Sequence, residues 1–190
     1  EMDLYNLNID FLISSPNKCL ESVPGFSFVI CKIKTLKTCI YSTSLCLDLL
    51  DQYLFFEKTN QFRFTPPINS IIAFKKALQN LEKEGGIINR EKRYKNNNKI
   101  LLNGMTKLGF KQLLFRKQKG HFLISFLYLN NNFDFNHFLN FLKTNNIIIY
   151  PYKTTKILSF RIGNIGQIFE KDIYKLLKVV KKYIENLNNK

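Results

Sequence analysis

One stretch decides the fold of this chain: Ile13-Ser14-Ser15-Pro16-Asn17-Lys18-Cys19-Leu20-Glu21-Ser22-Val23-Pro24-Gly25-Phe26. An apolar run, residues 9–13, leads into it and predicts a buried strand. A second run, residues 25–31, follows and alternates with the period of two that is typical of a strand. The Ser, Pro, Asn and Gly residues between the two runs favour a turn. We therefore expect Lys18 on a short loop between two strands.

Lys18 is the first candidate for chemistry in this chain. An amine that is partly desolvated at the edge of a sheet can act as a nucleophile or a base at neutral pH. Lysine side chains are mostly exposed, however, so the alternative is a solvated lysine in a turn. The local pattern alone leaves both interpretations open.

Periodic patterns predict alternating helices and strands in the rest of the chain. Thr65-Pro66 is a helix-start signal, with Thr65 at the N-cap and Pro66 at the first helical position. Gly85-Gly86 interrupts the helical pattern and marks a domain boundary, which a following helix is expected to bridge. Helices are expected at 46–58, from Thr65-Pro66 to Gly85, 87–108, 134–145 and 171–187. Strands are expected at 110–115, 121–129, 147–150 and 158–162.

Composition restricts the classes of partner. The net charge is +15, but the 29 lysine and arginine residues are spread along the chain with many asparagines, which favours solvated faces. The tracts 96–98 and 130–132 are expected to be exposed. The four cysteines form no C-x-x-C pair and only two histidines are present, so no metal site is predicted. We expect a cytoplasmic chain with no nucleic-acid and no membrane partner; a basic module that binds polyanions is the alternative.

The ordered blocks of this chain resemble the class V branch of the pyridoxal phosphate (PLP) aminotransferases. The lysine stretch resembles the segment whose lysine binds the cofactor covalently. The similarity covers nearly the whole chain, in the order of the family. The blocks are Asp10–Ser15, Asn17-Lys18-Cys19, Val23–Phe26, Arg63-Phe64-Thr65, Ala73-Phe74, Glu84-Gly85-Gly86, Arg93-Tyr94, Gly104-Met105, Leu108–Lys111, Ile149-Tyr150-Pro151 and Phe160–Gly166.

The resemblance implies an α/β fold, the C-terminal half of a fold type I PLP-dependent transferase. Residues 1–84 would be the C-terminal part of the large PLP-binding domain, and residues 85–190 the small domain with its bridging helix. The implied reaction moves the amino group of 2-aminoethylphosphonate to pyruvate, giving phosphonoacetaldehyde and L-alanine, in a homodimer with a shared active site. Another class V activity, such as transfer between alanine and glyoxylate, and an inactive fragment are the alternatives.

The resemblance also assigns site residues. Lys18 would be the catalytic residue and would bind PLP; Thr65, with Arg63 nearby, would bind the cofactor phosphate of the other subunit. Arg161 would bind the acid group of the substrate. The strand pattern agrees with that role, because Leu158, Phe160 and Ile162 are expected to face the core and Arg161 the opposite side. A guanidinium grips a carboxylate or phosphonate through two parallel hydrogen bonds.

Some positions depart from the family pattern. Tyr152 stands where the family usually has glycine after Tyr-Pro, and Pro16 and residues 20–22 differ from the commonest lysine loop. The phosphate-binding Ser-Gly-Thr loop, the aromatic residue that stacks on the cofactor ring and the aspartate that pairs with its nitrogen would all lie upstream of residue 1. We therefore expect a partial chain.

Overall fold

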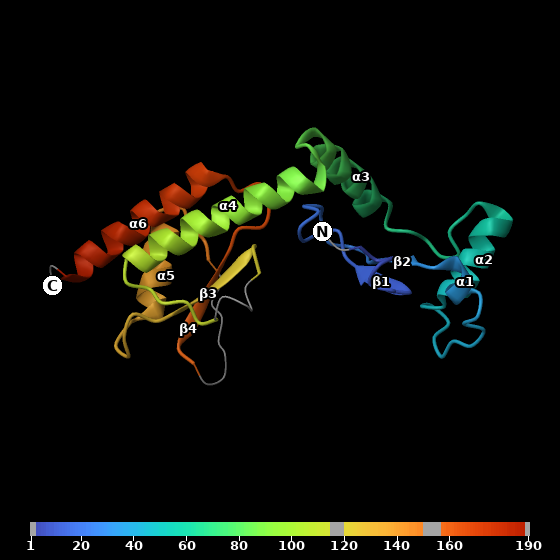
Figure 1. Ribbon diagram of the computed structural model, residues 1–190, viewed down its shortest axis with the longest axis horizontal. Coiled ribbons are helices and arrows are strands. Elements are labelled where there is room, and N and C mark those ends of the chain that lie inside the picture. Colours follow the sequence, from blue (N-terminus) through green and yellow to red (C-terminus); the bar gives the residue numbers. More distant parts are fainter. Residues whose placement is uncertain (1–2, 115–119, 150–156, 189–190) are drawn as a thin grey trace. The chain divides into compact units, whose positions relative to one another are not determined.

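The computed structural model describes residues 3–114, 120–149 and 157–188 (Figure 1). The chain divides into two compact units, Glu1–Lys83 and Glu84–Lys190. This boundary lies one residue from the division predicted after residue 84; the assignment of the units as large-domain and small-domain parts stays a prediction. Within the described ranges, no helix has the length and apolar character to span a membrane.

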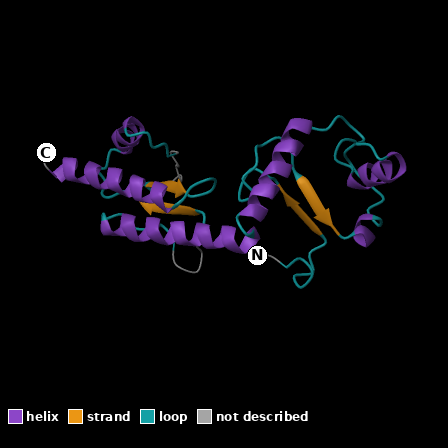
Figure 2. Cartoon of the chain, turned by 90° about the horizontal axis from the view of Figure 1, so that it is seen from above, coloured by secondary structure: helices purple, strands orange, loops and turns teal. Residues whose placement is uncertain are grey.

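The first unit contains a β-hairpin and three helices. Strand β1 (Phe11–Ser14) pairs antiparallel with β2 (Phe28–Cys31), with Leu12 opposite Ile30. The predicted pair of strands on either side of the Lys18 loop is therefore confirmed, but the burial predicted for the first strand is wrong, since Ile13 is 70% exposed. Three helices follow in the chain: α1 (Ile33–Leu36), α2 (Leu49–Thr59) and α3 (Ile68–Lys83). The long helix α3 lies beside the hairpin (Figure 2). The ring of Phe74 in α3 packs on those of Phe26 and Phe28.

Much of the apolar surface of the first unit is uncovered. Helix α2 buries none of its residues. Leu54 in α2 is 51% exposed, and Leu47, just before the helix, is 76% exposed. Among the described residues of this unit, the buried apolar side chains are those of Pro16, Leu36, Ala77 and Leu81. Contiguous exposed apolar surface is uncommon on an isolated domain and marks a face that another segment can cover.

The second unit has a denser core. Helix α4 (Gly86–Lys107) is followed by β3 (Leu123–Leu127), α5 (Phe135–Thr144), β4 (Ser159–Gly163) and α6 (Glu170–Asn188). Strands β3 and β4 pair antiparallel, and α4 and α6 run side by side over one face of this hairpin (Figures 1 and 2). Aromatic side chains fill the space between them: Phe110, Phe126, Phe138, Phe160 and Tyr183 are each at most 1% exposed.

The strand predicted at 147–150 is wrong over residues 147–149, and the strand predicted at 110–115 is reduced, up to residue 114, to an isolated bridge with β3. After α4, Gly109 has a φ of +92° and the Phe110 N–H donates to the Met105 carbonyl. After α5, Asn146 has a φ of +58° and the Ile147 N–H donates to the Leu142 carbonyl. These are Schellman closures, in which a left-handed residue and the apolar residue after it end a helix. The apolar residues at 110 and 147 therefore close helices. Up to residue 114, only an isolated bridge at Gln112 forms, and residues 147–149 form no strand.

Candidate active site

The Lys18 loop is a closed turn. The Glu21 N–H donates to the Lys18 carbonyl at 2.9 Å, and the Ser22 N–H donates to the Pro16 carbonyl at 3.0 Å. Glu21 adopts a left-handed backbone with a φ of +60°. Pro16 is buried, whereas the Lys18 side chain is exposed. The described residues thus present the amine of Lys18 at the surface of a fixed turn and do not supply the partial desolvation that its predicted role requires.

The exit of this loop is joined to the first turn of α3. Ser70 Oγ donates a hydrogen bond to the Pro24 carbonyl at 3.3 Å. The contact is close enough that a Cβ on Gly25 would lie 2.2 Å from Ser70 Oγ, and Gly25 has a φ of +149°. Only glycine adopts that backbone with that neighbour without strain. The N-terminal end of α3 is therefore held against the loop that carries Lys18.

Thr65 is not the N-cap of α3. The helix begins at Ile68, and the Ile71 N–H donates to the Pro67 carbonyl at 3.1 Å, which puts the cap at Pro67. The reason is the second proline: a residue before proline is disfavoured in the helical region, so Pro66 cannot start the helix ahead of Pro67. Thr65 is exposed and precedes this end of α3. Its predicted contact with a cofactor phosphate stays a prediction.

Arg63 has structural partners within the first unit. Its Nη2 forms an ion pair with Asp51 Oδ2 at 2.7 Å, and its Nη1 donates to the Leu45 carbonyl at 2.7 Å. The guanidinium carbon also lies 4.9 Å from the centre of the Phe64 ring. These contacts tie the segments before and after α2 together. A cofactor-binding role for Arg63 would have to share or replace them.

A cleft of about 740 Å³ opens beside Arg63. It lies between β2, α2 and the segment that leads into α3. Most of its lining is aromatic or aliphatic, with Arg63 as a charged member. Its apolar character resembles an uncovered core more than a polar reaction site, in keeping with the exposed apolar residues of α2.

Arg161 lies in the second unit, in β4 opposite Ser125 of β3. Phe160 and Ile162 on either side of it are 0% and 3% exposed, which confirms that they face the core, and Arg161 is half-buried. Leu158 was expected on the core face but is 55% exposed, because β4 begins only at Ser159. Tyr150, Pro151 and Tyr152 lie outside the described residues.

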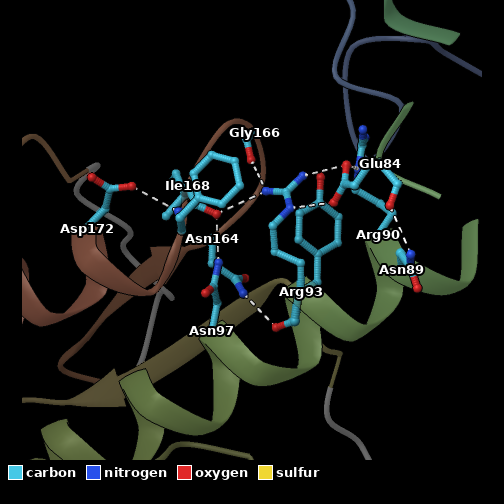
Figure 3. Close-up of polar contacts among 11 residues, drawn as sticks. Glu84, Asn89, Arg90, Arg93, Asn97, Asn164, Gly166, Ile168 and Asp172 are labelled. Carbon is cyan, nitrogen blue, oxygen red and sulfur yellow. Dashed lines mark hydrogen bonds and ion pairs between the residues drawn. The ribbon is translucent and has the colours of Figure 1, made fainter. Parts of the chain in front are cut away.

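Sequence reasoning did not single out a cluster of charged side chains at the start of α4 (Figure 3). Glu84 Oε2 accepts from Arg90 Nε at 2.5 Å, and Glu84 Oε1 accepts from Arg93 Nε at 2.7 Å. The side chains of Arg90 and Arg93 are only 5% and 10% exposed. Burial alone would raise the pKa of Glu84, but hydrogen bonds from Arg93 and Arg90 outweigh it and lower that pKa.

The same face of α4 holds the chain that leaves β4. Arg93 Nη1 donates to the carbonyls of Gly166 and Ile168, and Asn97 Nδ2 donates to the Ile168 carbonyl at 2.8 Å. Asn97 was expected to be exposed but is fully buried. The signal that could have shown this is the spacing: Arg90, Arg93 and Asn97 are three and four residues apart and share one helix face.

The amino-acid sequence of this chain is similar to those of known aminotransferases. The family model "Aminotransferase class-V" matches residues 1–151. 2-Aminoethylphosphonate–pyruvate transaminases of two Bacillus cereus strains are each 47% identical to this chain over 184 residues. The aligned part is 96% of this chain and 50% of each relative. The chain therefore spans about half the length of the curated relatives it matches.

Solved structures show the same fold at lower sequence identity. An alanine–glyoxylate aminotransferase from Nostoc sp. matches with a TM-score of 0.80 at 18% identity, over 96% of this chain and 50% of that one. A ureidoglycine–glyoxylate aminotransferase from Bacillus subtilis matches with a TM-score of 0.82 at 17% identity, over 99% and 50% of the two chains. The predicted α/β fold, part of a fold type I transferase, is thereby confirmed.

Proposed function

Since this chain belongs to the class-V aminotransferase family, we propose that it acts in a PLP-dependent transamination from 2-aminoethylphosphonate to pyruvate. The products would be phosphonoacetaldehyde and L-alanine. The observation that carries this proposal is the 47% identity with Bacillus cereus transaminases of that name, sustained over 96% of the chain. Fold similarity alone would not select a substrate, because one fold hosts many activities.

The chemistry of Lys18 fits the cofactor. A primary amine at the surface of a fixed turn can condense with an aldehyde, provided that another segment excludes water from it. PLP, when bound, supplies the aldehyde that takes up the amino group and a ring that withdraws electrons from the reacting carbon. Once released by substrate, the Lys18 amine would move a proton to and from the carbon that carries the amino group.

The N-terminal end of α3 offers a phosphate fewer N–H donors than a helix N-terminus without proline. Helix N-termini favour anions through free N–H groups and the helix dipole. Pro66 and Pro67 carry no N–H, so the amides of Asn69 and Ser70 and the hydroxyl of Thr65 would be the donors at this end. We propose Thr65 for the cofactor phosphate of a second subunit, with Arg63 in support. A homodimer with a shared site would follow.

Arg161 is proposed to bind the phosphonate of the donor and the carboxylate of the acceptor. The side chain is half-buried on a strand whose neighbours Phe160 and Ile162 are fixed in the core. A guanidinium on a rigid strand loses little freedom when it grips an anion through two hydrogen bonds. Replacement by lysine would keep the charge and lose the paired geometry.

The uncovered apolar face of the first unit supports the assignment of this unit to a larger domain. Exposed residues such as Leu54, Phe56 and Phe62 border the cleft or lie on α2. We propose that a further part of the large PLP-binding domain covers this face and also shields Lys18. The second unit, with its own dense core, would be the small domain.

The direct test is to measure alanine formation from pyruvate by the complete protein with a panel of amino donors. Turnover with 2-aminoethylphosphonate supports the proposal. Turnover with alanine and glyoxylate, but not with the phosphonate, would transfer the assignment to another class V activity. Absence of turnover together with strong retention on DNA at physiological salt would favour the alternative of a basic binding module.

A further inference from the structure

The chain segment that follows Arg161 is held from one side by α4. Three residues after Arg161, Asn164 is 1% exposed and its Nδ2 donates to the Tyr94 carbonyl at 2.9 Å and to the His121 carbonyl at 3.3 Å. Further along, Arg93 Nη1 donates to the carbonyls of Gly166 at 2.7 Å and Ile168 at 3.0 Å. The exit from β4 is thus fixed at three successive points, Asn164, Gly166 and Ile168 (Figure 3).

Arg93 is itself held on its other side. Its Nε and Nη2 donate to Glu84, at 2.7 Å and 3.4 Å, and its guanidinium lies about 5 Å from the Tyr94 and Phe169 rings. A planar guanidinium can make all of these bonds at once because its donors diverge in one plane. The ammonium of lysine, a single point, could pair with Glu84 or with the loop carbonyls but not with both in this geometry.

We infer that Arg93 is a positioning residue for Arg161. This inference rests on the proposed role of Arg161 in binding the acid group of the substrate. Arg93 fixes where the backbone goes after Gly163, the last residue of β4, and thereby fixes the end of the strand that presents the Arg161 guanidinium. Small displacements of a group that grips a ligand through two hydrogen bonds reduce binding steeply. Glu84 contributes by holding Arg93, and Asn97 contributes through its bond to the Ile168 carbonyl of the same loop.

The test compares Arg93→Lys with Lys95→Gln in the complete protein, by substrate kinetics and thermal unfolding. Lys95 is an exposed cation on the same helix, paired with Glu91, and serves as the matched control. Arg93→Lys keeps a charge but gives up some of the buried hydrogen bonds to Glu84 or to the loop carbonyls, so we expect its Tm to fall below that of the control while the variant stays folded at the assay temperature. We expect its KM for 2-aminoethylphosphonate to rise about tenfold, with kcat and PLP affinity unchanged.

Equal KM values for Arg93→Lys and Lys95→Gln would overturn the inference, whatever their Tm values. If Arg93→Lys does not fold, Asn97→Ala decides, since it removes only one bond to the same loop; an unchanged KM in that variant also overturns the inference. Arg161→Lys distinguishes failure of the substrate-binding role of Arg161 from failure of the positioning role of Arg93. If Arg161→Lys leaves KM unchanged, the proposed role of Arg161 fails. If Arg161→Lys raises KM but the Arg93 and Asn97 variants leave it unchanged, only the positioning role fails.

Discussion

Ser70 Oγ donates a hydrogen bond to the Pro24 carbonyl, and this bond joins the first turn of α3 to the loop that carries Lys18. The bond thereby links two elements with predicted cofactor roles: the lysine turn, for the site of its own subunit, and the helix end beyond Thr65, for the site of a second subunit. Gly25 leaves room for this contact, because a Cβ at that position would lie 2.2 Å from Ser70 Oγ.

Gly25→Ala is expected to lower the free energy of unfolding by about 1–3 kcal/mol, because an added Cβ would meet Ser70 Oγ and the backbone conformation disfavours alanine. Urea unfolding measures this effect. Ser70→Ala is the matched variant: it loses the bond to Pro24 but creates no overlap, so its cost should stay at about 0.5–1.5 kcal/mol. Equal costs for the two variants would contradict the close approach.

Glu84→Gln is expected to destabilise the second unit by about 2–3 kcal/mol at neutral pH, because it leaves the buried guanidinium groups of Arg90 and Arg93 without their carboxylate. The pH dependence has a definite sign. The pKa of Glu84 is lower in the folded chain, so its contribution is fully present above the ordinary value of 4.5 and is lost as pH falls through the folded value.

Chemical denaturation at pH 7 and at about pH 3 tests this prediction. The difference in unfolding free energy between wild type and Glu84→Gln should shrink at the lower pH. A difference that is the same at both pH values would show that the cluster does not titrate as described.

Variants of Arg63 can distinguish a structural role, pairing with Asp51, from a role in binding the cofactor. If its role is structural, Arg63→Gln should cost more unfolding free energy than Asp51→Asn, because it also loses the bond to the Leu45 carbonyl, and the double variant should cost little more than Arg63→Gln alone. The coupling energy of such a partly exposed ion pair should be about 0.5–1 kcal/mol. Loss of PLP affinity in Arg63→Gln, with full affinity retained in Asp51→Asn, would instead favour the predicted cofactor role.

The sequence predicted secondary structure correctly where a helical pattern of apolar residues continues over many residues. The predicted helices 87–108 and 171–187 appear as Gly86–Lys107 and Glu170–Asn188, because their apolar stripes leave little choice of face. The lysines of α6, such as Lys178 and Lys182, are exposed, as expected for basic residues spread along the chain. The lysine loop was also predictable, since two strand patterns flank a run of turn residues.

The errors have a common physical origin in what happens at helix ends. Phe110 and Ile147 looked like the start of strands, but each closes the helix before it. Thr65 looked like an N-cap, but the second of two prolines moved the helix start to Ile68. Asn97 looked solvated, because its burial depends on a carbonyl at Ile168 that local pattern cannot reveal.

Lys18 is proposed as the residue that binds PLP. The measurement that tests it most directly is borohydride reduction of the complete protein with PLP, followed by peptide mapping by mass spectrometry. We predict one stable pyridoxyl phosphate adduct on the peptide that contains Lys18, lost in Lys18→Arg and kept in Lys34→Arg, a variant of an exposed lysine in the same unit. An adduct on another lysine, or none, would contradict the account.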